Sequence, residues 1–168
     1  PKGSKIKTED IMDRVPMTEG GHETLVKELK NLKSVERPNV VDAIEEARAH
    51  GDLSENAEYH AARDKQSFIE GRIAELEDKL SRAEVIDTSQ IKGVIIRFGA
   101  TVSVVDEDTD EESTYQIVGE DEADVGSGLL SVTSPLARAL ISKEVGDSIE
   151  LTTPGGSKGY EILKLLYK

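Results

Sequence analysis

The chain has 168 residues and a formal net charge of −13, with 33% charged, 36% apolar and 4% aromatic residues. Because binding to DNA or RNA depends on Lys and Arg side chains that neutralise phosphates, this charge argues against autonomous DNA binding. It favours a basic protein surface as partner, although acidity that only maintains solubility explains it equally well. The chain has no cysteine and no apolar run of the ~20 residues that span a bilayer. We therefore expect a cytoplasmic protein with no membrane partner.

Residues 1–14 are interpreted as an N-terminal extension without an assigned function, and the sequence leaves open whether they are native. A first long helix is predicted to begin after Thr18, which is a favourable N-cap residue. Apolar residues then recur at steps of four and three in two groups, Leu25, Leu29 and Leu32, then Val40, Ile44 and Ala47. The register slips by one residue between the groups, where Pro38 lies. Because proline lacks an amide donor, we expect a continuous helix that is bent or loosened there, and two helices broken at Pro38 are the alternative.

A second helix is predicted from a coiled-coil seam of apolar residues at steps of four and three, Ile69, Ile73, Leu76, Leu80 and Ala83. The same register continues towards the N-terminus through Gln66, Ala62 and Tyr59. Only a short turn around residues 51–56 joins the two helices, so they must run antiparallel. The sequence therefore predicts a helical coiled-coil hairpin over residues 15–85.

Beyond Val85 the periodicity becomes that of strands, expected at 94–98, 100–105, 113–118, 149–152 and 160–166, with one helix at 135–141 after Ser134. The acidic stretch 106–112 lacks the glycine and the terminal glutamate of an EF-hand loop, and is predicted to be a solvated hairpin loop. The glycine-rich stretch 154–159 lacks phosphate-loop spacing and is predicted to be a hairpin turn. The fold class is therefore α+β, with a small antiparallel sheet and one helix over residues 86–168.

The turn between the two predicted helices carries two carboxylates, Asp52 and Glu55. Their spacing is typical of a capping box, in which Asp52 caps the second helix and Glu55 reaches back, and spacing alone favours that interpretation. Two exposed carboxylates could instead ligate Mg²⁺, but only in a site that another molecule completes. No nucleophilic or metal-binding motif stands out elsewhere, so an autonomous enzyme is not expected.

The run of residues 43–63, which includes His50-Gly51-Asp52-Leu53-Ser54-Glu55-Asn56, resembles the GreA/GreB family of bacterial transcript cleavage factors. Further similar segments are residues 16–18, 35–38, 117–124 and 134–140. The resemblance implies that the coiled coil enters the secondary channel of bacterial RNA polymerase, while an FKBP-like C-terminal domain docks at the channel rim. It also implies that such a factor rescues arrested complexes by stimulating hydrolysis of the backtracked RNA 3′ end.

In the mechanism that the resemblance implies, Asp52 and Glu55 are the catalytic groups and act in the polymerase active site, where they hold a Mg²⁺ ion jointly with the polymerase. The factor alone is then a monomer that is not an enzyme and binds no cofactor. Arg48 and Arg63 match basic family positions that contact the polymerase or the displaced RNA, and surface ion pairs with neighbours such as Glu45 are the alternative. The few cations in residues 61–67 favour the GreA branch over the more basic GreB branch.

Two further residues near the turn, Asn56 and Tyr59, are also expected to contact the polymerase or RNA, although seam packing explains the position of Tyr59 better. A rival interpretation, a prolyl isomerase, requires an apolar aromatic pocket. Beyond residue 85 only four aromatic residues could build one, Phe98, Tyr115, Tyr160 and Tyr167. A third interpretation is a coiled-coil scaffold in which substitutions in the turn have no effect.

Overall fold

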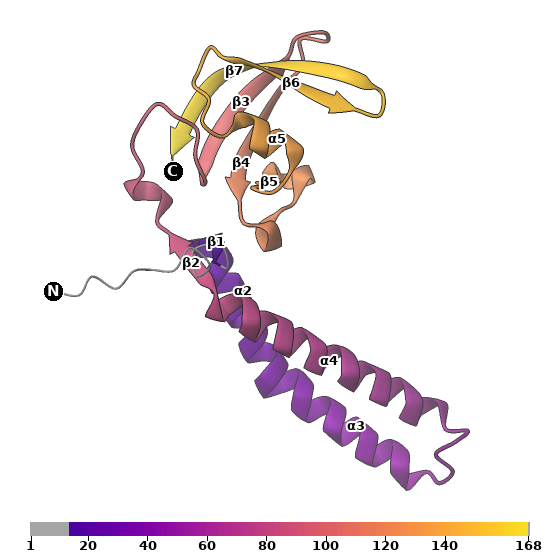
Figure 1. Ribbon diagram of the computed structural model, residues 1–168. Helices are drawn as coiled ribbons and strands as arrows, with labels where there is room; N and C mark the ends of the chain where they lie inside the picture. The colour runs from indigo at the N-terminus through magenta and orange to yellow at the C-terminus, as the bar shows by residue number, and fades with distance from the viewer. Residues whose placement is uncertain (1–13, 168) are drawn as a thin grey trace, which may run out of the picture. The chain divides into compact units, whose positions relative to one another are not determined.

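The computed structural model describes residues 14–167, which form two compact units. One unit, His22–Ala83, is a helical hairpin, and the other joins Val15–Gly21 to the chain from Glu84 onwards, which is mostly β-sheet. The predicted α+β class is confirmed (Figure 1). The predicted N-terminal extension lies outside the described residues except for Arg14. Among the described residues, no helix is long and apolar enough to cross a membrane.

The first arm of the hairpin is one continuous helical path made of α2 (Glu19–Asn31), the π-helical turn η1 (Leu32–Glu36) and α3 (Arg37–Ala49). Thr18 caps α2 as predicted, because its Oγ1 accepts a hydrogen bond from the Gly21 N–H at 3.0 Å. In η1 the Arg37 N–H donates to the carbonyl of Leu32, five residues earlier. This wider turn accommodates one additional residue, which explains the slip in the apolar register next to Pro38. The continuous helix is confirmed, and the two-helix alternative is wrong.

The second arm is α4 (Ala57–Ser81), which packs beside α3 in the antiparallel direction (Figure 1). The predicted seam is confirmed by the apolar side chains buried along the hairpin, Leu25, Leu32, Val40, Ile44, Ala47, Ala62, Ile69, Ile73 and Leu76. Tyr59, Gln66 and Leu80 on the same stripe are half-buried. The buried part of the seam ends near the loop in two small residues, Ala47 and Ala62.

Ion pairs join the two arms along their length. Arg37 on α3 donates through Nε and one terminal nitrogen to the Glu70 carboxylate on α4, both at 2.8 Å. Arg72 on α4 forms the same two-bond pair with Glu28 on α2, at 2.8 and 3.0 Å. The forked geometry of guanidinium and carboxylate makes such pairs sensitive to a shift of one helix along the other.

The second unit is built on a five-stranded sheet in the order β5-β4-β3-β7-β6. Its strands are β3 (Ala100–Asp106), β4 (Glu112–Val118), β5 (Leu129–Ser131), β6 (Ser148–Thr153) and β7 (Gly156–Tyr167). The pairings are antiparallel as predicted, except that the short β5, which was not predicted, pairs in parallel with β4. The helix α5 (Pro135–Leu140) begins after its predicted cap Ser134, whose Oγ accepts from the Ala137 N–H at 3.2 Å. Leu140 is fully buried against the core of this sheet.

The predicted strand at 94–98 is wrong. Only Ile95 forms an isolated bridge, with Glu144, and the backbone of Ile96 hydrogen-bonds Ser142 and Lys143, each at 2.9 Å. Strand β3 already has β4 and β7 on its two sides, so it offers no free edge to this segment. Ile96 is nevertheless fully buried, whereas its apolar neighbours Val94 and Ile95 are exposed.

Two strands of four residues, β1 (Val15–Thr18) and β2 (Ala83–Ile86), pair in a small sheet that was not predicted. Both predicted hairpin turns of the larger sheet are confirmed. Between β3 and β4, the buried carboxylate of Asp106 accepts hydrogen bonds from the backbone of Asp108 and Thr109, at 2.9 and 3.2 Å. The first of these bonds is the main cause that lowers the pKa of Asp106. The glycine-rich segment joins β6 to β7 through Pro154 and Gly155.

Candidate functional site

The loop between α3 and α4 reverses the chain in a few exposed residues. Gly51 follows the last turn of α3 with φ of 111°, a conformation that glycine adopts without strain. Asp52 then accepts two hydrogen bonds through Oδ1, from the N–H and the hydroxyl of Ser54, at 3.0 and 2.9 Å. The carboxylate of Asp52 thus stabilises the turn in which it lies, and these two hydrogen bonds order residues 52–54 of the loop.

The capping box expected for Asp52 and Glu55 is wrong, because α4 is capped by Asn56. The Oδ1 of Asn56 accepts from the Tyr59 N–H at 3.0 Å, and α4 begins at Ala57. The reversal takes all the residues from Gly51 to Glu55, so Asp52 lies too far from the helix to cap it. Asparagine is among the best N-cap residues, so its position directly before an apolar helical pattern was the signal that could have located the cap.

Two further contacts tie the loop to the helices. The Nδ2 of Asn56 donates to the carbonyl of Ala47 at 2.7 Å, across the reversal of the chain. The Nε2 of His60, on the first turn of α4, lies 3.1 Å from the carbonyl of Ser54. Hydrogen bonds therefore connect the loop region to both α3 and α4.

Asp52 and Glu55 are both exposed and line an open depression together with His50, Asn56, Ala57 and Glu58. Neither carboxylate has an ion-pair partner within residues 14–167. In the same part of the chain, no group of three or more His, Cys, Asp or Glu side chains is placed to hold a metal ion. Carboxylate oxygens are ligands that Mg²⁺ prefers, but two of them need waters or further ligands from another molecule. The pair therefore fits a shared Mg²⁺ site and not a self-sufficient one.

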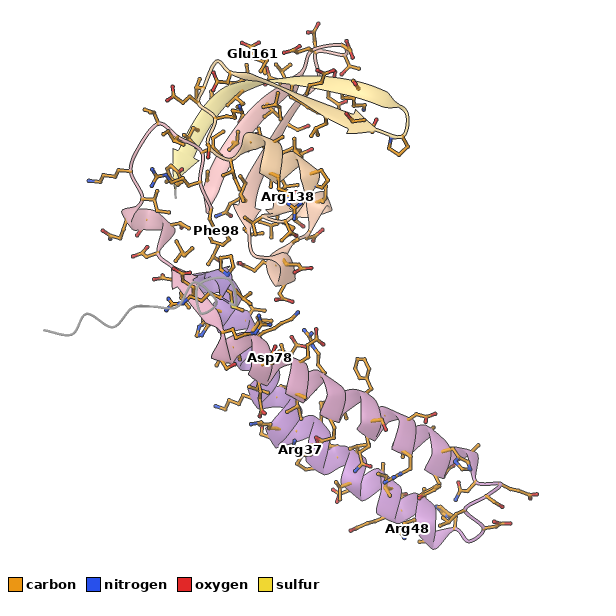
Figure 2. All side chains as sticks on the ribbon, viewed as in Figure 1. Arg37, Arg48, Asp78, Phe98, Arg138 and Glu161 are labelled. Atoms are coloured by element: carbon orange, nitrogen blue, oxygen red, sulfur yellow. The ribbon has the colours of Figure 1, made fainter. Side chains whose placement is uncertain are left out.

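The other residues expected at the site lie on the two helices next to the loop. Figure 2 shows Arg48 at the loop end of the hairpin, where it is exposed and has no ion-pair partner among the residues described. Arg63 donates to the side chain of Gln66 at 3.0 Å. Within residues 14–167, neither arginine forms the alternative ion pair with a neighbouring carboxylate. Tyr59 is half-buried, and its ring and that of His60 lie in an edge-to-face arrangement with a centroid distance of 5.6 Å.

Three of the four aromatic residues that a prolyl isomerase would need for its pocket pack against the core of the sheet instead. These three are Tyr115, Tyr160 and Tyr167. The hydroxyl of Tyr167 donates to the Ile95 carbonyl at 2.6 Å and accepts from the Arg97 N–H at 3.0 Å, and burial raises the pKa of this tyrosine. These contacts hold the segment before β3 in place, and they give no support to an isomerase pocket.

The fold and the loop define a protein whose helical hairpin ends in two exposed carboxylates and shares one chain with a small α+β unit. Residues 15–85 match the family described as transcription elongation factor, N-terminal, and residues 92–167 match transcription elongation factor, GreA/GreB, C-terminal. The two matches together span nearly all of the described chain. The chain belongs to the GreA/GreB family of transcription elongation factors.

Individual relatives match this chain over nearly the whole length of both sequences. The chain is 64% identical over 157 residues to transcription elongation factor GreA of Hyphomonas neptunium, a match that covers 94% of this chain and 100% of the relative. It is 66% identical over 154 residues to the GreA of Caulobacter sp. strain K31, covering 92% and 98%. Among solved structures, GreA factor homolog 1 of Thermus thermophilus is 28% identical with a TM-score of 0.42, covering 91% of this chain and 99% of that one.

Proposed function

We propose that this chain inserts its hairpin into the secondary channel of bacterial RNA polymerase and stimulates Mg²⁺-dependent hydrolysis of the backtracked RNA 3′ end. Arrested complexes are rescued because the cleavage creates a new 3′ end in the polymerase active site. The factor acts as a monomer and is not itself a nuclease. Close relatives that are named transcription elongation factor GreA support this proposal.

The main support for the proposal is that the carboxylates of Asp52 and Glu55 are exposed and unpaired within the described residues. Both carboxylates are exposed, and no cationic side chain of the described residues neutralises either of them. Moving two carboxylates from water into a confined site costs free energy unless a cation in that site pairs with them. A catalytic Mg²⁺ that the polymerase holds incompletely is a partner of this kind.

In this proposal Asp52 and Glu55 hold the Mg²⁺ together with carboxylates of the polymerase. When bound, the ion supplies charge neutralisation at the phosphodiester and activates a water molecule. The contribution of the chain is placement, which the register of the two arms and the ordered loop make reproducible. Arg48 and Arg63 are free of ion pairs among the described residues and contact the polymerase or the displaced RNA.

The test uses stalled, backtracked elongation complexes of a bacterial RNA polymerase, in which released 3′ fragments are measured against time. The unaltered protein should accelerate the release, and Asp52→Ala and Glu55→Ala should each lower the accelerated rate about tenfold or more at saturating factor. Asp42→Ala is the matched control, because Asp42 is exposed on α3 away from the loop. Wild-type rates in both loop variants, or cleavage of free RNA by the factor alone, would contradict the proposal.

A further inference from the structure

The side chain of Asn56 makes two hydrogen bonds that point to opposite arms of the hairpin. Its carbonyl oxygen accepts from the Tyr59 N–H at 3.0 Å and caps α4. Its amide nitrogen donates at 2.7 Å to the Ala47 carbonyl, which also accepts from the His50 N–H at 3.2 Å. One side chain therefore ties the end of the first arm to the start of the second.

The acceptor on the first arm belongs to a buried residue. Ala47 is only 3% exposed and is the last buried residue of the seam on α3. Asp52 and Glu55 lie between Ala47 and Asn56, and Glu55 immediately precedes Asn56 in the chain. The bond across the reversal closes this segment into a ring whose ends are fixed, so it limits the positions that the two carboxylates can take.

We propose that Asn56 is a positioning residue that holds Asp52 and Glu55 in the geometry needed for stimulated cleavage, an inference that rests on the function proposed above. It replaces the expectation that Asn56 contacts the polymerase or RNA. The side chain is half-buried, and both its oxygen and its nitrogen are already engaged within the hairpin. Asn56 thus acts on the reaction through its neighbours and not by contact with the substrate.

Two substitutions separate the bond to Ala47 from the helix cap. Asn56→Ser preserves the cap, because serine is an equally good N-cap residue, but its side chain is too short to bridge to Ala47. Asn56→Asp preserves both the shape and the cap acceptor, but it loses the N–H donor and adds a negative charge. Asn39→Ser and Asn39→Asp are the matched controls, since Asn39 is exposed on α3 and these changes alter composition and charge equally.

The experiment measures fragment release from backtracked complexes over a range of factor and Mg²⁺ concentrations, with thermal melting of each variant followed by circular dichroism. Asn56→Ser and Asn56→Asp should lower the rate at saturating factor about tenfold, as for other residues that orient metal ligands. The factor concentration that gives half of the maximal rate should not change, nor should the melting temperature. Higher Mg²⁺ should restore part of the lost rate, and the Asn39 variants should match the wild type.

Other results would overturn the inference in distinguishable ways. A higher half-saturating concentration with an unchanged maximal rate would make Asn56 a contact residue. A wild-type rate in both Asn56 variants would show that the bond to Ala47 does not matter for the reaction. A rate loss that follows a lower melting temperature and is insensitive to Mg²⁺ would make the role purely structural. If instead Asp52→Ala also cleaves like the wild type, the proposed function itself has failed.

Discussion

The carboxylate of Glu122 accepts a hydrogen bond from the backbone N–H of Thr18 at 3.1 Å, although 104 residues separate the two in the chain. The same carboxylate accepts from the Thr18 hydroxyl and from the Gly119 N–H, the latter at 3.1 Å. Thr18 in turn caps α2. Glu122 therefore fixes the start of α2 within the unit that also contains the sheet.

The first prediction concerns this carboxylate. Glu122→Ala removes the carboxylate that accepts from the Thr18 N–H, and a lost hydrogen bond to a charged group costs about 1.5–3 kcal/mol of unfolding free energy. Urea unfolding monitored on the sheet unit should show this loss, and hydrogen exchange of the Thr18 amide should become faster. Glu120→Ala, an exposed neighbour in the same 3₁₀ turn, should change neither measurement appreciably.

A second prediction follows from the contact between Gly21 and Glu122. A Cβ atom on Gly21 would overlap the Glu122 Cδ, so Gly21→Ala must displace the carboxylate and should destabilise the protein about as much as Glu122→Ala. In the Glu122→Ala background the same change should instead stabilise, by up to ~1 kcal/mol, because alanine is the better helix former. A double-mutant cycle in urea measures this reversal of sign. Additive losses would contradict it. Gly20→Ala is the control, because a Cβ atom there would lie 3.9 Å from the Thr18 Oγ1, an ordinary van der Waals distance.

The third prediction concerns pH and the Arg37–Glu70 pair. The hydrogen bond from Arg37 lowers the pKa of Glu70 from its ordinary value of 4.5. A carboxyl whose pKa is lower in the folded state stabilises at pH values above its unfolded pKa, and this contribution disappears as the pH falls through the folded value. Glu70→Gln should therefore lower the melting temperature slightly at pH 7 and have no effect at strongly acid pH. A difference that persists at acid pH would show that packing and not charge is responsible.

Exchange of the two charges tests the register of the same pair. Glu70→Arg alone should destabilise the hairpin, since it places two guanidinium groups together, and adding Arg37→Glu should recover most of the melting temperature. High salt should reduce both effects, because both side chains are partly exposed. Failure of the double variant to recover would mean that the pair does not determine how the arms align.

A fourth prediction concerns the π turn. Deletion of Ser34, an exposed residue within η1, would bring Leu32 and Val40 to a spacing of seven and allow a regular α-helix, so the hairpin should keep its helicity and melting temperature. Deletion of Asp42 in α3 removes a residue from a regular segment and should destabilise strongly, since it rotates Ile44 and Ala47 out of the seam relative to Val40. Circular dichroism melts of the two deletions give the comparison. Equal destabilisation would contradict the proposed role of the π turn.

The hairpin was predictable from the sequence because a seam with steps of four and three repeats many times, from Leu25 to Ala47 and from Ala62 to Leu80. The slip near Pro38 was visible, but its π-helical form was not, because a kink accommodates a slip equally well. Short pairings such as β1 with β2, and the parallel β5, contain too few residues for a periodic signal. The segment around Ile96 was misassigned because a short apolar run does not say which strand edges are vacant, and only Ile96 in this run is buried.

The loop was harder to predict. Asp52 and Glu55 were correctly expected to be exposed at the reversal of the chain, yet the spacing of three between them also matched a capping box. How many residues the reversal uses decides which side chain reaches the first turn of α4, and the spacing of Asp52 and Glu55 does not determine that number. The bond from Asn56 to Ala47 joins residues on different helices, so it depends on how the arms pack.

The small residues at the loop end of the seam imply a gradient of local stability along the hairpin. Ile69, Ile73 and Leu76 bury large side chains, whereas Ala47 and Ala62 contribute little apolar surface near the loop. The free energy of local opening should therefore decrease towards Ala57, and the hairpin should fray from its loop end when heated. The hydrogen bonds of Asn56 therefore lie at the end of the hairpin where the free energy of local opening is lowest.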